Sequence, residues 1–266
     1  MMNSAKPEPS VKLTKDGSTT LFSSAYNQHY HNPNGAVAES RHVFFESTGL
    51  AELLQTDEPL TIFETGFGTG LNLVLCLDYL NQTNRKTAVT FQSVEAYPIK
   101  PKTARELSFG DELFLNDQVP ILTEIFDGLK PGLNQIETNT FLKLELFWGE
   151  FDDFPDFSNE LTPDSPRVNF ILHDPFSPDV NPELWTPDVF KKLYQISTSD
   201  AILATYCAAT SARAAMAVAG WNVARARGAL GKREMTIASK SAEKLSAFKR
   251  VNENRLVERF KKGDFG

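Results

Sequence analysis

A glycine-rich turn stands between a short apolar run and an amphipathic stretch of this 266-residue chain. It reads Glu64-Thr65-Gly66-Phe67-Gly68-Thr69-Gly70 and is followed by Leu71 and Asn72. Glycine lets the backbone turn and approach a ligand that a side chain would exclude. In dinucleotide folds a similar turn opens a helix and cradles a pyrophosphate. The string therefore predicts a ligand site, although an ordinary tight turn between a strand and a helix would contain the same glycines.

The acid before the first glycine indicates which ligand fits. Glu64 would repel a phosphate, but it suits a ligand that carries an ammonium group and no phosphate. S-adenosylmethionine is such a ligand. We therefore predict that this cofactor is bound by the turn and the start of the helix, at Glu64, Gly66, Phe67, Gly68, Gly70 and Asn72.

Two further acids end neighbouring apolar runs. Glu95 lies about 31 residues after Glu64, where a carboxylate can accept both ribose hydroxyls of a nucleotide. Gly149 and Glu150 follow a third run, and an acid there can accept the adenine amino group. Each acid alone is more often a surface charge or a helix cap. Three of them at one sheet edge are harder to attribute to chance, so all are predicted to contact the cofactor.

The fourth run ends in His173-Asp174-Pro175-Phe176, which resembles the Asp-Pro-Pro-(Tyr/Phe) signature of methyltransferases that act on exocyclic amines. An amine nucleophile must aim its lone pair at the methyl carbon, and Asp174 can hold one N–H and accept its proton. The aromatic ring of Phe176 offers a face to a base or to a sulfonium. Asp174 is thus predicted to be catalytic and, with Phe176, to contact the cofactor. The alternative is a proline-rich turn in which Asp174 caps the loop backbone.

Alternating apolar strands and amphipathic helices position these residues. Strands are predicted over 61–64, 88–94, 143–148, 168–172, 201–206, 221–225 and 234–238, and helices over 71–81, 189–196 and 211–219. This order predicts an α/β fold with a mostly parallel sheet covered on both faces. Such sheets bind ligands at the carboxyl ends of their strands. We divide the chain into an N-terminal extension (1–50), a main domain (51–240) with a helical insertion at about 101–140, and a basic tail (241–266).

Composition narrows the functional classes. The net charge of −7 argues against a general nucleic-acid coat, since phosphate binding needs cations. Residues 240–266 nevertheless hold eight basic side chains against four acidic ones, which fits either a solvated helix face or a binding patch. The two cysteines and four histidines lack metal-ligand spacing, so no metal is expected. No apolar run approaches membrane-spanning length, and a cytoplasmic protein without membrane contact is expected.

Strings along most of the chain resemble one family, the tRNA wobble-uridine methyltransferases of the MnmC methyltransferase-domain and stand-alone MnmD type. The matching strings are Asp16-Gly17-Ser18, Tyr30 to Gly35, Glu39 to Phe44, Glu64 to Asn72, Glu95 to Pro98, Asp174 to Pro178, Asn181 to Trp185, Ala204 to Tyr206 and Gly231 to Met235. The long glycine string, the Asn-Pro-x-x-Trp and the Lys-Arg-Glu-Met are specific. The resemblance implies a Rossmann-like methyltransferase with a seven-stranded sheet and helices on both faces.

The resemblance also implies the reaction, which is S-adenosylmethionine-dependent methylation of a 5-aminomethyl-uridine at the tRNA wobble position, with Asp174 as the catalytic carboxylate. Members with a fused flavin-dependent oxidase are longer, so methylation alone, without flavin, is expected here. The expected partners are the tRNA anticodon stem-loop and a separate oxidase or other wobble-modification enzymes. Substrate contacts are predicted at Tyr30, His31, Arg41, Pro175, Phe176, Trp185, Lys232 and Arg233, the last two on anticodon phosphates.

Three other functions remain open on the sequence. A nicotinamide-dependent oxidoreductase would need a phosphate-friendly glycine turn, which Glu64 disfavours. A methyltransferase or aminopropyltransferase acting on a small amine shares the fold and suits the acidic composition. A catalytically silent binding module is the third, and the acids at the strand ends speak against it.

Overall fold

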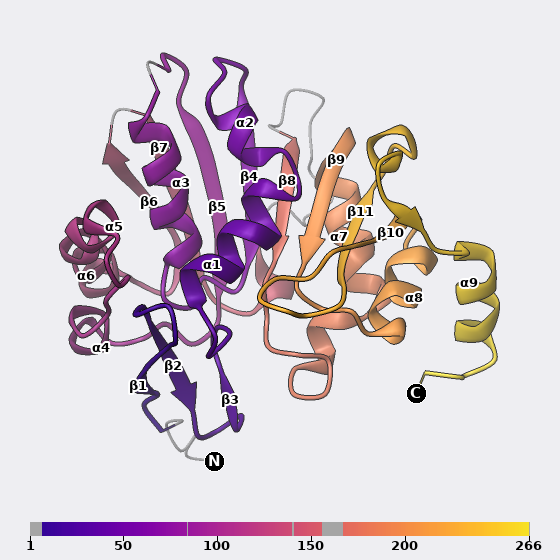
Figure 1. The fold of residues 1–266 in the computed structure, drawn as a ribbon, viewed down its shortest axis with the longest axis horizontal. Helices are drawn as coiled ribbons and strands as arrows, with labels where there is room; N and C mark the ends of the chain where they lie inside the picture. The colour runs from indigo at the N-terminus through magenta and orange to yellow at the C-terminus, as the bar shows by residue number, and fades with distance from the viewer. Residues whose placement is uncertain (1–6, 84, 140, 156–166, 266) are drawn as a thin grey trace.

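The computed structural model describes residues 7–83, 85–139, 141–155 and 167–265. Among these residues a central sheet is formed by β4 (Leu60–Thr65), β5 (Val89–Glu95), β6 (Gly132–Asn139), β7 (Leu142–Trp148), β8 (Val168–His173), β9 (Ser197–Thr205), β10 (Asn222–Ala226), β11 (Met235–Ser239) and β12 (Lys249–Arg250). Its nine strands follow the order β12-β10-β11-β9-β8-β4-β5-β7-β6 (Figure 1). The five strands from β9 to β7 pair in parallel, and the strands outside them pair antiparallel.

The α/β prediction is confirmed, but the sheet has two strands more than expected. One is β6, which replaces the end of the expected helical insertion. It is an edge strand in which only Leu133 and Ile136 are large apolar residues, so its sequence lacks a buried strand's apolar run. The rest of the insertion is helical, in α4 (Pro101–Arg105), α5 (Leu113–Asp117) and α6 (Val119–Gly128).

Two hydrophobic clusters cover the two faces of the sheet. Successive strand residues alternate between them, as Ile62 and Phe63 do on β4. The first cluster contains residues of α1 (Ala36–Ser40), α2 (Leu50–Leu54), α3 (Leu71–Asn81) and α6. The second contains residues of α7 (Pro187–Ile196), α8 (Thr210–Val218) and α9 (Glu253–Lys261). The glycine turn therefore joins a fully buried strand to a helix that is packed on the first face.

A small antiparallel sheet precedes the main one. Its strands are β1 (Ser10–Leu13), β2 (Thr19–Ser23) and β3 (Gln28–His29), and it lies beside the carboxyl ends of the central strands (Figure 1). The turn between β1 and β2 contains Gly17, at φ +83°. A π-helical segment, η1 (Arg41–Glu46), follows α1. The extension thus brings Tyr30 and His31 to the carboxyl edge of the central sheet.

The last residues are folded, which corrects the expectation of a basic tail from residue 241. β12 pairs with β10, and α9 packs against α8 through Leu256. The Asn252 side chain accepts a hydrogen bond from Arg255 N at 2.9 Å and so caps α9. Across the described residues, every helix is too short or too polar to cross a lipid bilayer.

Candidate active site

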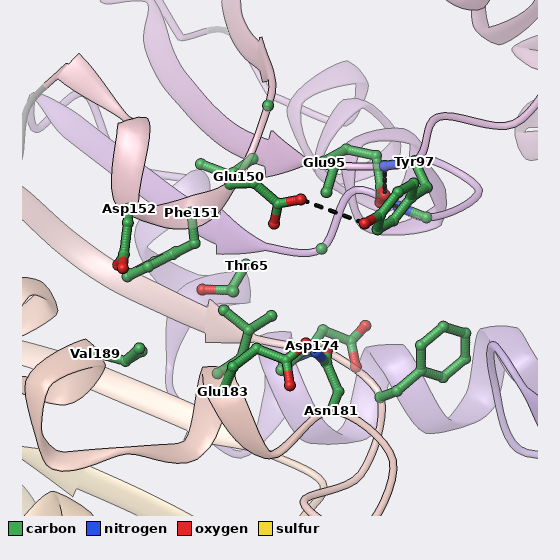
Figure 2. A pocket seen from close by; sticks show the side chains of 18 of the residues that line it. Thr65, Glu95, Tyr97, Glu150, Phe151, Asp152, Asp174, Asn181, Glu183 and Val189 are labelled. Atoms are coloured by element: carbon green, nitrogen blue, oxygen red, sulfur yellow. Dashed lines mark hydrogen bonds between the residues drawn. The ribbon is translucent and has the colours of Figure 1, made fainter. Parts of the chain in front are cut away.

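A cavity of about 370 Å³ opens where β4, β5, β7 and β8 end. Figure 2 shows Glu95, Tyr97 and Glu150 on one wall, with Asp174 and Glu183 on the opposite wall. Five carboxylates line the cavity, and none of its described lining residues is a lysine or arginine. Such a cavity attracts a cation and repels a phosphate.

Two glycines of the turn bring separate parts of the chain together beside this cavity. Gly66 has φ +89°, and a Cβ there would lie 3.2 Å from the Asp174 carbonyl oxygen. Gly68 has φ +54°, and its Cβ would lie 3.3 Å from the Tyr30 ring. Both line the cavity as predicted for cofactor-binding residues. The sequence therefore uses glycine here for close backbone approach as well as for left-handed φ.

Glu95 at the end of β5 and Glu150, two residues after β7, form one wall through a short hydrogen-bond chain. Glu95 accepts hydrogen bonds from Gly68 N at 2.9 Å and from Tyr97 N at 2.8 Å. The Tyr97 hydroxyl donates to Glu150 Oε1 at 3.3 Å. The two hydrogen bonds to Glu95 fix its carboxylate at the cavity wall. Gly149 also lines this wall, and its cofactor contact, like those of Glu95 and Glu150, stays a prediction.

Asp174 is the first residue after β8, and its backbone N–H donates to Thr65 O at 3.1 Å. Its carboxylate accepts a hydrogen bond from Asn72 Nδ2 at 3.2 Å. Burial raises the pKa of Asp174 well above its usual value, and the charges of Glu64 and Glu39 raise it further. Such a carboxylate binds a proton more readily than an ordinary aspartate.

Two side chains fix the loop after Asp174 by hydrogen bonds to its backbone carbonyls. The Tyr206 hydroxyl donates to Pro175 O, and Trp185 Nε1 donates to Phe176 O, each at 2.8 Å. Pro175 and Phe176 line the cavity, and Phe176 packs edge-on against Tyr30, with ring centroids 5.0 Å apart. Trp185 itself is buried and lines no described cavity. Its predicted substrate contact is therefore replaced by a positioning role.

Glu64 lies beneath the cavity, which corrects the expectation of direct cofactor contact. Its side chain is fully buried and accepts hydrogen bonds from Ser93 Oγ at 2.7 Å and Asn72 Nδ2 at 2.9 Å. Burial raises the pKa of Glu64 to about 8, although both hydrogen bonds lower it. Three other predicted cofactor ligands also lie outside the lining: Phe67, Gly70 and Asn72.

Each of these three supports the site instead of lining it. Phe67 packs on Phe126, with ring centroids 5.6 Å apart. Gly70 begins α3 at φ +77°, where a Cβ would lie 2.6 Å from Leu122. The Asn72 amide donates to both buried carboxylates, Glu64 and Asp174. Gly66 and Gly68 of the glycine turn thus line the cavity, whereas Phe67 and Gly70 lie against α6.

Arg41 also lies outside both cavities described here, contrary to its predicted substrate contact. Its guanidinium pairs with Asp78 and with Glu112, both at 2.9 Å. It ties η1 to α3 and to the start of α5. Arg233 is exposed and lies outside both cavities, so its predicted phosphate contact stays a prediction.

A second cavity of about 220 Å³ adjoins the first. Tyr30 and Asp174 line both cavities, and His31, Glu39, Tyr206 and Lys232 line the second. Tyr30, His31 and Lys232 are predicted substrate residues that the fold brings together here. The sequence analysis did not select Glu39 or Tyr206, although both stand in strings that carry the family resemblance.

Within the described residues, no group of three or more His, Cys, Asp or Glu side chains is arranged to hold a metal ion. The family model for S-adenosyl-L-methionine-dependent methyltransferases matches residues 119–241. In solved structures, MnmC2 from Aquifex aeolicus superposes with a TM-score of 0.75 at 25% identity, over 97% of this chain and 77% of that one.

Curated relatives share a similar extent of this chain. The tRNA 5-methylaminomethyl-2-thiouridine biosynthesis bifunctional protein MnmC of Ralstonia nicotianae is 34% identical over 231 residues, which cover 86% of this chain and 34% of the relative. The MnmC protein of an Azoarcus species is 31% identical, over 85% of this chain and 34% of the relative. The chain thus spans about a third of the length of these relatives.

Proposed function

Because this chain belongs to the S-adenosyl-L-methionine-dependent methyltransferase family and shares most of its length with MnmC proteins, we propose that it methylates the amino group of a 5-aminomethyl-uridine at the tRNA wobble position. The observation that carries the proposal is the position of Asp174. It lies at the carboxyl edge of the sheet and lines both the larger, acidic cavity and the smaller one.

The larger cavity fits S-adenosylmethionine. Its volume is within the range of small-molecule sites, about 300–1,000 Å³. Its acidic lining suits the positive sulfonium and ammonium groups, whereas the pyrophosphate of a nicotinamide cofactor would meet carboxylates without a cation. In this arrangement Glu95 would hold the ribose, Glu150 the adenine amino group, and the Gly66 and Gly68 backbone the amino-acid part.

The residues around Asp174 then supply orientation and proton transfer. When bound, S-adenosylmethionine would supply an electrophilic methyl group on a positive sulfur for transfer to the amine nitrogen, with S-adenosylhomocysteine as the leaving group. An alkylammonium with a pKa of about 10.4 must first lose a proton. Asp174 accepts it, while the Asn72 amide fixes the carboxylate and Tyr206 fixes the following loop.

Methyl transfer from labelled S-adenosylmethionine to tRNA that lacks the modification tests this function. The labelled nucleoside should be the 5-methylaminomethyl form. Labelling of a polyamine in place of tRNA would favour the small-amine alternative. Equilibrium dialysis with S-adenosylmethionine and a nicotinamide cofactor separates the oxidoreductase alternative.

The catalytic role is tested by Asp174→Ala and Asp174→Asn. Both should keep cofactor affinity and lose turnover by about 10²–10⁴-fold, the usual contribution of general-base catalysis. Asp179→Asn is a matched control, because Asp179 is an exposed aspartate of the same loop outside both cavities. Near-normal turnover of the Asp174 variants would refute the assignment.

The tRNA is expected to meet the exposed side of the same edge. Arg233→Ala should weaken tRNA binding and flatten its salt dependence, because one phosphate contact is lost. We further propose that an oxidase or another wobble-modification enzyme supplies the aminomethyl precursor, since the matched relatives are named as bifunctional.

A further inference from the structure

The smaller cavity contains a buried carboxylate that the proposed reaction does not yet use. Glu39, on α1, is 8% exposed, and Asn32 donates to both of its oxygens at 3.1 Å. Its Oε1 also accepts a hydrogen bond from Lys232 Nζ at 2.7 Å. The cavity thus already holds one primary ammonium, that of a lysine, on a carboxylate that has been fixed in advance.

The surroundings of this ammonium are those that a primary amine ligand needs. Lys232 Nζ lies 5.2 Å from the centroid of the Tyr206 ring, within cation–π distance. Asp174 and Tyr30 complete the lining toward the cofactor cavity. An ammonium in this cavity would be surrounded by a carboxylate, an aromatic face and the proposed proton acceptor.

A tight turn presents the lysine. Leu230 and Gly231 both have positive φ, and Lys232 N donates to Ala229 O at 2.8 Å. A Cβ on Gly228 would lie 2.6 Å from the Lys232 carbonyl oxygen. The backbone position of Lys232 is therefore fixed, while its side chain remains 42% exposed and can leave Glu39 for solvent.

The charges of the cavity also match one monocation. Glu39 supplies one negative charge, which the Lys232 ammonium neutralises at 2.7 Å. His31 adds no charge at neutral pH, since burial lowers its pKa to about 4. One alkylammonium that took the place of Lys232 would neutralise Glu39 in the same way.

We propose that the smaller cavity is the acceptor chamber, in which Glu39 selects an alkylammonium substrate and Lys232 is the internal counter-ion that this ammonium replaces. The inference rests on the proposed function and adds to it the residue that recognises the amine. Glu39 acts in binding and Asp174 in proton transfer, so the two carboxylates have separable effects.

The test compares two anticodon stem-loop RNAs that differ only in a 5-aminomethyl or 5-hydroxymethyl group on the wobble uridine. Their dissociation constants are measured with S-adenosylhomocysteine present. Wild-type protein should prefer the aminomethyl RNA, and Glu39→Gln should reduce this preference by about 10- to 100-fold, as expected for a hydrogen bond to a charged group. Its affinity for the hydroxymethyl RNA and for the cofactor should not change, whereas a purely structural role would weaken both.

Three variants complete the test. Glu39→Asp keeps the charge and should keep most of the preference. Glu112→Gln removes a carboxylate from an ion pair outside both cavities and should behave as wild type. Lys232→Met should increase the amine preference several-fold, because the competing ammonium is gone.

Each contrary result has a distinct meaning. A preference that survives Glu39→Gln overturns the role of Glu39, and equal weakening of both RNAs by Lys232→Met overturns the counter-ion role in favour of a phosphate contact. A wild-type protein that binds both RNAs equally would overturn this inference, whereas methylation of the aminomethyl RNA by the same protein decides separately whether the proposed function holds.

Discussion

Replacing Glu64 by glutamine should change how the stability of the protein depends on pH. Glu64 is fully buried, and burial raises its pKa to about 8 from the ordinary 4.5. A carboxyl whose pKa is higher in the folded than in the unfolded state stabilises the fold only while it is protonated. Its contribution is complete below pH 4.5 and is lost as the pH rises through about 8.

The size of the effect follows from the two pKa values. At 1.36 kcal/mol per pH unit, the loss between them reaches at most about 5 kcal/mol, of which about 3 kcal/mol has been lost at pH 7. Glutamine has nearly the same shape and does not ionise. The Glu64→Gln protein should therefore gain stability relative to wild type as pH rises, with a plateau above about pH 8.

Urea unfolding of both proteins at intervals from pH 5 to 9 measures this difference directly. Glu145→Gln serves as the control. Burial raises the pKa of Glu145, but hydrogen bonds from Lys143 and Gln92 outweigh burial and hold the pKa below 4.5. The contribution of Glu145 to stability is lost only at lower pH. The difference in unfolding free energy between Glu145→Gln and wild type should therefore stay constant from pH 5 to 9. A flat difference for Glu64→Gln as well would refute the reasoning, because it would mean that the buried carboxyl titrates normally.

Three other outcomes are expected. Gly70→Ala should cost about 1–3 kcal/mol more than Gly132→Ala in urea unfolding, because both glycines have positive φ but only Gly70 is crowded; equal costs would contradict this. Arg41→Met should lower stability by about 1 kcal/mol and leave turnover unchanged, whereas lost turnover at unchanged stability would restore its substrate role. Lys232→Met should move the acidic limb of kcat/KM to higher pH, since the Lys232 charge lowers the pKa of Asp174; an unmoved limb would show that the two groups do not interact.

The strand ends show how far the sequence determines the site. The predicted strand over 61–64 is β4, but β4 continues to Thr65. This difference of one residue decides which side chain faces the cavity, because side chains alternate between the two faces along a strand. Thr65 at the end lines the cavity, whereas Glu64 one residue earlier turns into the protein. Glu95 at its strand end and Asp174 just beyond its own line the cavity as predicted.

Contacts between distant segments were not predictable in the same way. Arg41 was predicted to contact the substrate, but its partners Asp78 and Glu112 come from later segments of the chain. The pair of Glu39 and Lys232 joins residues 193 positions apart, so no local pattern reveals it. The helix over 253–261 was visible in principle, since Asn252 stands at its N-cap and Leu256 begins an apolar stripe.

The two buried acids bridged by Asn72 divide their roles according to their surroundings. Glu64 has no exposed surface and a pKa of about 8, so at neutral pH it is mostly protonated and holds the amide at little electrostatic cost. Asp174 lines both cavities, and burial raises its pKa well above the usual value, although the Asn72 hydrogen bond and the Lys232 charge lower it. The acid one residue before the strand end is thus enclosed in the protein, whereas the acid just after a strand end faces the space in which the amine is proposed to bind.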